Sequence, residues 1–126
     1  MANVTVRSDV TAGSLTISQS SSLSHEVLVQ VQETVAGSTT NQELVCAVDV
    51  SKAKCVAMLA KGADLTVKTN STGSPDDTIN LTDGEALIWK SGGYFDNPLT
   101  VDVTKFYLTN ADTADVTFSL IVLSEA

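Results

Sequence analysis

Hydrophobic and polar residues alternate with a period of two along most of the chain. In residues 25–35, HEVLVQVQETV, valines at every second position share one face, and the leucine and glutamines between them share the other. Successive side chains of a strand point to opposite faces, so this pattern predicts a half-buried β-strand. The same alternation recurs in five further segments, 15–18, 65–68, 79–82, 106–109 and 116–122.

Turn-forming residues separate these segments at short spacing. Clusters of Gly, Ser, Pro and Asp occur at 12–14, 36–38, 73–77 and 91–93. Asp83-Gly84 lies between two β-prone segments and predicts a two-residue hairpin. Eight or nine strands separated in this way predict an all-β fold, an antiparallel β-sandwich of jelly-roll type.

Two segments leave alternatives open. Residues 53–63, AKCVAMLAKGA, fit a short helix or a strand buried on both faces. We favour the strand, because the β-prone residues 44–50 precede it and would pair with it in a hairpin. The serine-rich residues 14–24 fit a flexible connection or an arm that orders on a partner, and a plain loop is favoured.

The length of 126 residues corresponds to one domain. We expect a single β-sandwich domain over 1–126, in which 1–24 form an N-terminal arm and the first strands. The opening MANVTVRSDV lacks the apolar stretch of a secretory signal peptide. We therefore expect synthesis and folding in the cytoplasm.

The charge balance narrows the range of partners. Fifteen acidic residues against seven basic ones give a net charge of −8, which argues against binding to nucleic acid or to an anionic membrane surface. No apolar stretch approaches the roughly 18 residues of a spanning helix.

The chain offers little catalytic chemistry. His25 is the only histidine, so a serine or cysteine enzyme has just one candidate base. We expect His25 to be an exposed residue at the start of a strand. No glycine-rich phosphate loop is present. We expect a protein that is not an enzyme and that holds no cofactor.

Acidic residues and cysteines are the candidate metal ligands. Asp76-Asp77, near Asn70 and Ser74, and Asp96-Asn97 could supply oxygens for calcium, but their spacing matches no EF-hand loop. Solvated turns are the favoured interpretation, and no metal is expected.

Cys46 and Cys55 lie nine residues apart around residues 51–54. They would face each other if these residues turned a hairpin. Reduced, buried thiols are the favoured interpretation, because cytosolic cysteines stay reduced.

Trp89, Tyr94 and Phe95 form the candidate interaction site. Aromatic residues are scarce, at 5% of the chain, yet these three lie close together around Gly92-Gly93. One interpretation is a sugar- or protein-binding patch at one end of the sandwich. The other is that Trp89 fills the core and Phe95 closes the end of the sandwich.

Residues 61–123 carry a resemblance to a known group of proteins. The strand 65–70, the acidic turn 74–77, the strand ending at Trp89, the strand 106–110 and the valine-rich terminus resemble the small jelly-roll decoration, or cement, proteins of tailed bacteriophages.

The resemblance implies a non-catalytic virion protein. It would bind and stabilise the outer surface of an assembled capsid as a homotrimer, with itself and the major capsid protein as partners. The alternative is a β-sandwich binding module for a sugar or surface receptor, carried by a phage tail fibre or surface protein. The decoration-protein interpretation also predicts an apolar strand face left over outside the sandwich core, with residues 44–50 and 55–60 as its candidates.

Overall fold

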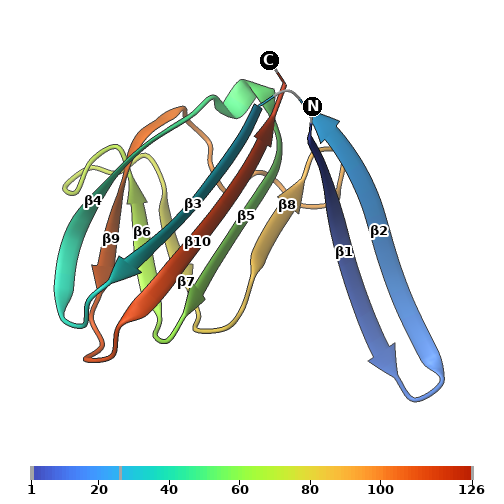
Figure 1. Cartoon of the computed structure of the whole chain (residues 1–126), viewed down its shortest axis with the longest axis horizontal. Helices are drawn as coiled ribbons and strands as arrows, with labels where there is room; N and C mark the ends of the chain where they lie inside the picture. Colours follow the sequence, from blue (N-terminus) through green and yellow to red (C-terminus); the bar gives the residue numbers. More distant parts are fainter. Residues whose placement is uncertain (1, 26, 126) are drawn as a thin grey trace.

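The computed structural model describes residues 2–25 and 27–125 and shows an all-β fold without α-helices in this part of the chain (Figure 1). Eight strands form a sandwich of two sheets, and two more form a separate hairpin. The ten strands exceed the eight or nine expected because of this hairpin. They are β1 (Ala2–Ala12), β2 (Leu15–His25), β3 (Val27–Val35), β4 (Thr39–Val48), β5 (Ala53–Lys61), β6 (Leu65–Thr69), β7 (Thr78–Leu81), β8 (Leu87–Lys90), β9 (Val103–Asn110) and β10 (Val116–Ser124), with a short 3₁₀ turn, η1, at Val50–Lys52.

The strand order of the sandwich is that of a jelly roll. One sheet has the order β3-β10-β5-β8 and the other β4-β9-β6-β7. Strands β3 and β10 pair, β4 and β9 pair, β5 and β8 pair, and β6 and β7 pair, all antiparallel. The chain runs through β3 to β6 and then returns through β7 to β10, so that the first of these strands pairs with the last, the second with the next to last, and so on. These successive pairs lie alternately in the two sheets. The expected antiparallel, jelly-roll-like β-sandwich is confirmed.

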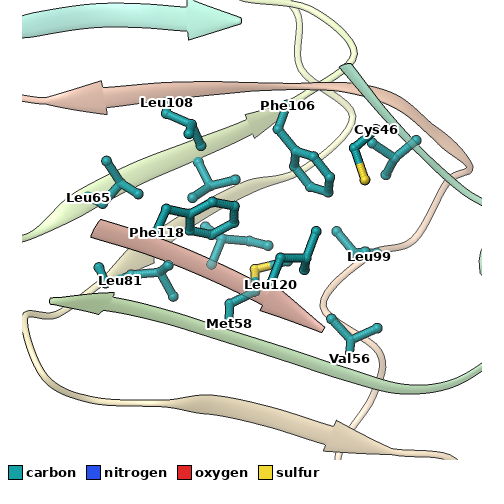
Figure 2. Packing of buried hydrophobic residues seen from close by; sticks show 14 of the residues in the cluster. Cys46, Val56, Met58, Leu65, Leu81, Leu99, Phe106, Leu108, Phe118 and Leu120 are labelled. Carbon is teal, nitrogen blue, oxygen red and sulfur yellow. The ribbon is translucent and has the colours of Figure 1, made fainter. Parts of the chain in front are cut away.

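The core lies between the inner faces of the two sheets. Phe106 on β9 and Phe118 on β10 are fully buried, and their ring centroids lie 6.3 Å apart at an interplanar angle of 55°. Figure 2 shows aliphatic side chains from both sheets around these rings. Tilted aromatic pairs at this distance stabilise a core beyond the area that they bury.

The segment 53–63 contains the strand β5, as favoured, but its expected pairing is wrong. β5 pairs with β10 and β8, whereas the preceding strand β4 pairs with β9 in the other sheet. The 3₁₀ turn η1 carries the chain from one sheet to the other, and Asp49 caps it by accepting hydrogen bonds from the backbone and hydroxyl of Ser51.

Asp83-Gly84 does not turn a hairpin. β7 and β8 lie in different sheets, so residues 82–86 cross between them. The Asp83 carboxylate accepts a hydrogen bond from the Gly62 amide at 2.8 Å, and the Gly84 amide donates to the Ala60 carbonyl at 2.8 Å. These bonds hold the turn against the β5–β6 crossing, which directs the chain into the other sheet.

Residues 14–24 do not form the favoured plain loop. They contain β2, which pairs with β1 in continuous register from Ala2–His25 to Ala12–Leu15. Gly13, with a φ of +60°, lies in the two-residue turn of this hairpin. The serines from 18 to 22 are paired through the backbone alone, which hydrophobic alternation does not reveal.

Asn110 is the fully buried polar side chain at the end of β9. Its amide donates to the carbonyls of Val35, Ala36 and Ala114 at 3.2, 3.3 and 2.7 Å, and its side-chain oxygen accepts from the Asp112 amide at 3.1 Å. The side chain thereby joins the end of β3 to the β9–β10 connection.

We expect Asn110→Asp to lower the free energy of unfolding by about 2–4 kcal/mol at pH 7, because a carboxylate would face carbonyl oxygens that need a donor. Urea denaturation followed by circular dichroism measures the loss. Asn80→Asp, at an exposed position, is the matched control and should change stability by less than about 0.5 kcal/mol. Equal losses in the two variants would contradict this role.

Candidate functional site

The three aromatic residues singled out from the sequence lie at the β8 edge of the sandwich. Trp89 is on β8, while Tyr94 and Phe95 are in the following loop. Trp89 is half-buried and packs against the core, and its Nε1 donates to the Phe95 carbonyl at 2.9 Å. The side chains of Tyr94 and Phe95 point to solvent, with exposed fractions of 102% and 81%. Trp89 thus supports the loop, and Phe95 does not close the end of the sandwich.

These aromatics line a shallow pocket together with the β1–β2 hairpin. The pocket measures about 130 Å³ and includes Val6, Ser8 and Gln19 from the hairpin. Sites for drug-sized ligands usually measure roughly 300–1,000 Å³. A larger hollow of about 670 Å³ lies elsewhere, between residues 64–66, 80–82 and 109–113, and no aromatic residue lines it. The structure therefore brings the three aromatics together in a site of small volume.

The acidic turns are occupied by internal hydrogen bonds. The Asp76 carboxylate accepts from the Asn70 amide at 2.7 Å, and Asp77 accepts from the backbone and hydroxyl of Thr100, each at 2.8 Å. Asn97 accepts from the Leu99 amide at 3.0 Å. These contacts tie the β6–β7 loop to the β8–β9 loop and are typical of turn structure.

Asn70 is the centre of this loop network. It adopts a φ of +67°, donates to the Asp102 carbonyl at 2.8 Å, and accepts from the Thr104 amide at 2.8 Å. Within residues 2–25 and 27–125, no three His, Cys, Asp or Glu side chains gather where they could hold a metal ion.

His25 is the last residue of β2 and does not open a strand as expected. Its side chain lies outside the part of the chain that the structure describes, so its predicted exposure stays a prediction. No helix in the described residues is long and apolar enough to cross a membrane.

Both cysteines are free and buried. Cys46 lies on β4 and Cys55 on β5, in different sheets, so they do not face each other across a ladder. Cys46 belongs to the core between the sheets, whereas Cys55 alternates with the core residue Val56 and lies on the outer side of its sheet. Burial raises the pKa of both thiols.

The outer faces of the two sheets differ in chemistry. On the β4-β9-β6-β7 sheet, Tyr107 pairs with Glu43 and Lys68, and Lys105 forms an ion pair with Glu43 at 2.8 Å. The hydrogen bond and charge of Glu43 raise the pKa of Lys105. Val45 is an exposed aliphatic residue on this otherwise polar surface.

The outer face of the β3-β10-β5-β8 sheet carries a cluster of apolar residues beside polar ones such as Gln30, Gln32 and Ser119. Aliphatic side chains from all four strands lie next to one another here, outside the core cluster. Ile121 pairs with Ala57, which pairs with Ile88, and Leu59 lies one row away, opposite Ser119. We call this surface the outer apolar face; its residues are Leu28, Ala57, Leu59, Ile88 and Ile121. The expected leftover apolar face is present at residues 55–60, whereas residues 44–50 contribute mainly Val45.

The hairpin reaches the outer apolar face only at its β8 edge, where Val6, Ser8 and Gln19 line a pocket together with Ile88. It stands beside β8 and projects away from the sandwich, without lying over β5 or β10 (Figure 1). Leu59 and Ile121 are thus half-buried and Ile88 is exposed on this side, whereas the row of Cys55 and Leu123 beside Leu28 is buried. Hydrophobic periodicity showed that β5 is apolar on both sides, but only the strand order showed which neighbours extend this surface.

Comparisons with known proteins leave the family open. No protein-family model matches the chain, and no curated protein matches it either. A chain from the disulfide-linked pili of Bacillus endospore appendages aligns over 82% of this chain and 93% of its own, with 16% identity and a TM-score of 0.35. A likeness this distant carries no functional argument. The resemblance to phage decoration proteins stays a prediction.

We expect Trp89→Ala to lower the free energy of unfolding by about 2–4 kcal/mol, because it removes packing against the core and the bond to Phe95. Tyr94→Ala should change it by no more than about 0.5 kcal/mol, because that side chain is exposed. Thermal and urea denaturation measure both. A large loss for Tyr94→Ala and none for Trp89→Ala would reverse the assignment.

We expect both thiols to resist labelling by a disulfide reagent at pH 8 in the folded protein and to react fully in denaturant. In the folded protein, burial raises the pKa of each thiol above the ordinary 9.0. The contribution of the two thiols to the free energy of unfolding is therefore fully present below pH 9, and it is lost as the pH rises through the pKa values of the folded protein. The stability of a Cys46→Ala, Cys55→Ala variant should therefore depend less on pH above 9. Rapid labelling of the native protein would contradict this.

Proposed function

We propose that the protein is a non-catalytic structural subunit of a phage particle that binds the outer surface of the assembled capsid. The outer apolar face carries this proposal. A β-sandwich that stands alone in water keeps polar residues outside both sheets, as this one does on the β4-β9-β6-β7 side. An extended apolar surface on the other side is typical of a protein that is covered by partners.

The proposed partners are further copies of the chain, as a homotrimer, and the major capsid protein. The proposed location is the virion, after synthesis in the host cytoplasm. The resemblance of residues 61–123 to decoration proteins supports the capsid as the site of binding. A net charge of −8 also fits this role, because it limits non-specific capture by nucleic acid. The proposal assigns no catalytic residue and no cofactor.

The exposed aromatic side chains favour a second candidate function. Tyr94 and Phe95 project from the loop that Trp89 supports, and exposed aromatic rings can stack on sugars or anchor proteins. In this alternative the chain is a binding module of a tail fibre or surface protein. Glycan binding that is lost in a Tyr94→Ala, Phe95→Ala variant, with stability unchanged, would favour it.

The decisive experiment is co-sedimentation of the purified protein with assembled capsids of the phage that encodes it. We expect saturable binding to shells, and light scattering should give a solution mass near three times the 13.2 kDa of the chain. Leu59→Asp, on the outer apolar face, should weaken binding by about tenfold or more, whereas Thr66→Asp, on the polar outer face, should not. No binding to shells would overturn the capsid proposal.

A further inference from the structure

Within residues 2–25 and 27–125, β1 and β2 form a two-stranded ribbon and pair with each other and no further strand. Isolated two-stranded ribbons are marginally stable in water, because neither face is packed against another layer. At the middle of its strands, the hairpin meets the β8 edge through Val6, Ser8 and Gln19. Beyond these residues it projects past the sandwich (Figure 1), so its tip has no covering layer in a single copy.

The two faces of the hairpin have opposite character. The register places Val10 opposite Ile17 and Ala12 opposite Leu15, so these side chains share one face at the tip. Val10, Ile17 and Leu15 have exposed fractions of 68%, 66% and 63%. The other face carries only polar side chains along its described length, at positions 5, 7, 9, 11, 16, 18, 20 and 22. A ribbon that is aliphatic on one face and polar on the other is suited to packing its aliphatic face against an apolar surface.

The same chain contains an apolar surface that fits this tip. The outer apolar face presents Leu59, Ile88 and Ile121 to the outside of the sandwich. Fifteen acidic residues repel one copy from another, but the strands of this sheet hold only one of them, Glu33. Glu33 accepts a hydrogen bond from Gln42 at the sandwich edge, on the side of β3 away from the outer apolar face.

Apart from Glu33, the charged side chains on the strands of this sheet are basic, and Lys54 on β5 is paired with Glu125 at 2.9 Å. Lys61 and Lys90 lie at strand ends next to the outer apolar face. Two copies of an acidic protein therefore meet with least repulsion on this side. The tip's apolar face is itself uncharged, because Arg7 and Asp9 lie on the opposite face and pair with each other at 2.9 Å.

We propose that the hairpin tip of one copy docks its apolar face, Val10, Leu15 and Ile17, on the outer apolar face of a second copy. Each copy donates one tip and receives one. The contact joins two different surfaces, so repetition closes a ring or a reciprocal pair, or continues as a filament. This inference rests on the proposed function in one respect: both proposals assign the outer apolar face to association with another molecule.

The contact area determines the strength of this association. The tip beyond Ser8 and Gln19 has four residues per strand and measures about 13 by 10 Å. Two reciprocal tips bury on the order of 600–1,200 Å² in total, at or below the lower limit of specific interfaces. We therefore expect association in the micromolar range in solution. On a particle surface, where many copies are held close together, the effective concentration makes it stronger.

Sedimentation equilibrium of the full chain from 1 to 200 µM tests the proposal. Ile17→Asp should weaken self-association by about ten- to a hundredfold, because it places a charge in the docked face. Thr16→Asp adds the same charge to the polar face of the same hairpin and should leave the association unchanged. Circular dichroism and thermal melting verify that each variant is folded.

A charge-exchange variant identifies the receiving surface. Ile17→Asp combined with Leu59→Lys should restore much of the association, because the new carboxylate meets a lysine on the second copy. Leu59→Lys alone should weaken the association, and adding Thr16→Asp to it should bring no recovery. Recovery in the first variant alone would support docking between the tip and the outer apolar face.

Three results would overturn this inference. The first is a wild-type chain that stays monomeric up to 200 µM. The second is an association that persists in the Ile17→Asp variant but is abolished in the Leu59→Asp variant. The second result would leave the outer apolar face as an association surface and the proposed function standing. Weaker capsid binding by Ile17→Asp at unchanged solution mass would show that the capsid protein, and not a second copy, receives the tip.

Discussion

Closure of the two sheets over a shared apolar interior is the constraint on which the other features of the protein depend. Phe106 and Phe118 come from strands of opposite sheets and meet at the centre, with aliphatic side chains of both sheets around them. Hydrophobic burial supplies most of the stability of such a domain. Since each strand presents only alternate residues to this interior, the remaining side chains face outward whatever their chemistry.

The connections between the sheets are held by polar side chains. Asn70, Asp83 and Asn110 each bond to backbone groups far away in sequence. These bonds satisfy backbone groups where the ladders end, and an unsatisfied buried group costs about 1–3 kcal/mol. The acidic turns that resemble candidate ligand sites in the sequence thus have a structural role.

The surface of the sandwich is asymmetric in a way that bears on association. One outer face carries the Glu43–Lys105 ion pair and threonines, and the other carries Leu59, Ile88 and Ile121. The hairpin tip repeats this division on a smaller scale, with Val10, Leu15 and Ile17 on one face and threonine, serine and charged residues on the other. Both surfaces carry exposed aliphatic side chains, and they are the surfaces that we propose for association.

The alternation of residues by itself determined the all-β class, most of the strands and the double-sided apolar character of β5, because side-chain direction in a strand follows directly from sequence position. It could not determine which strands become neighbours, since pairing depends on contacts between distant segments. For that reason the pairing expected around residues 51–54 and the hairpin expected at Asp83-Gly84 were wrong. The serine-rich part of β2 after Ser18 was missed because backbone pairing with β1, not hydrophobic alternation, identifies it as a strand. Likewise, Trp89, Tyr94 and Phe95 could be singled out from the sequence because they lie close together in it.

Only the tertiary structure decided that Trp89 supports the loop while Tyr94 and Phe95 face solvent. It also decided that the apolar residues of β5, β8 and β10 form one continuous outer face. Both outcomes depend on how the two sheets enclose the core.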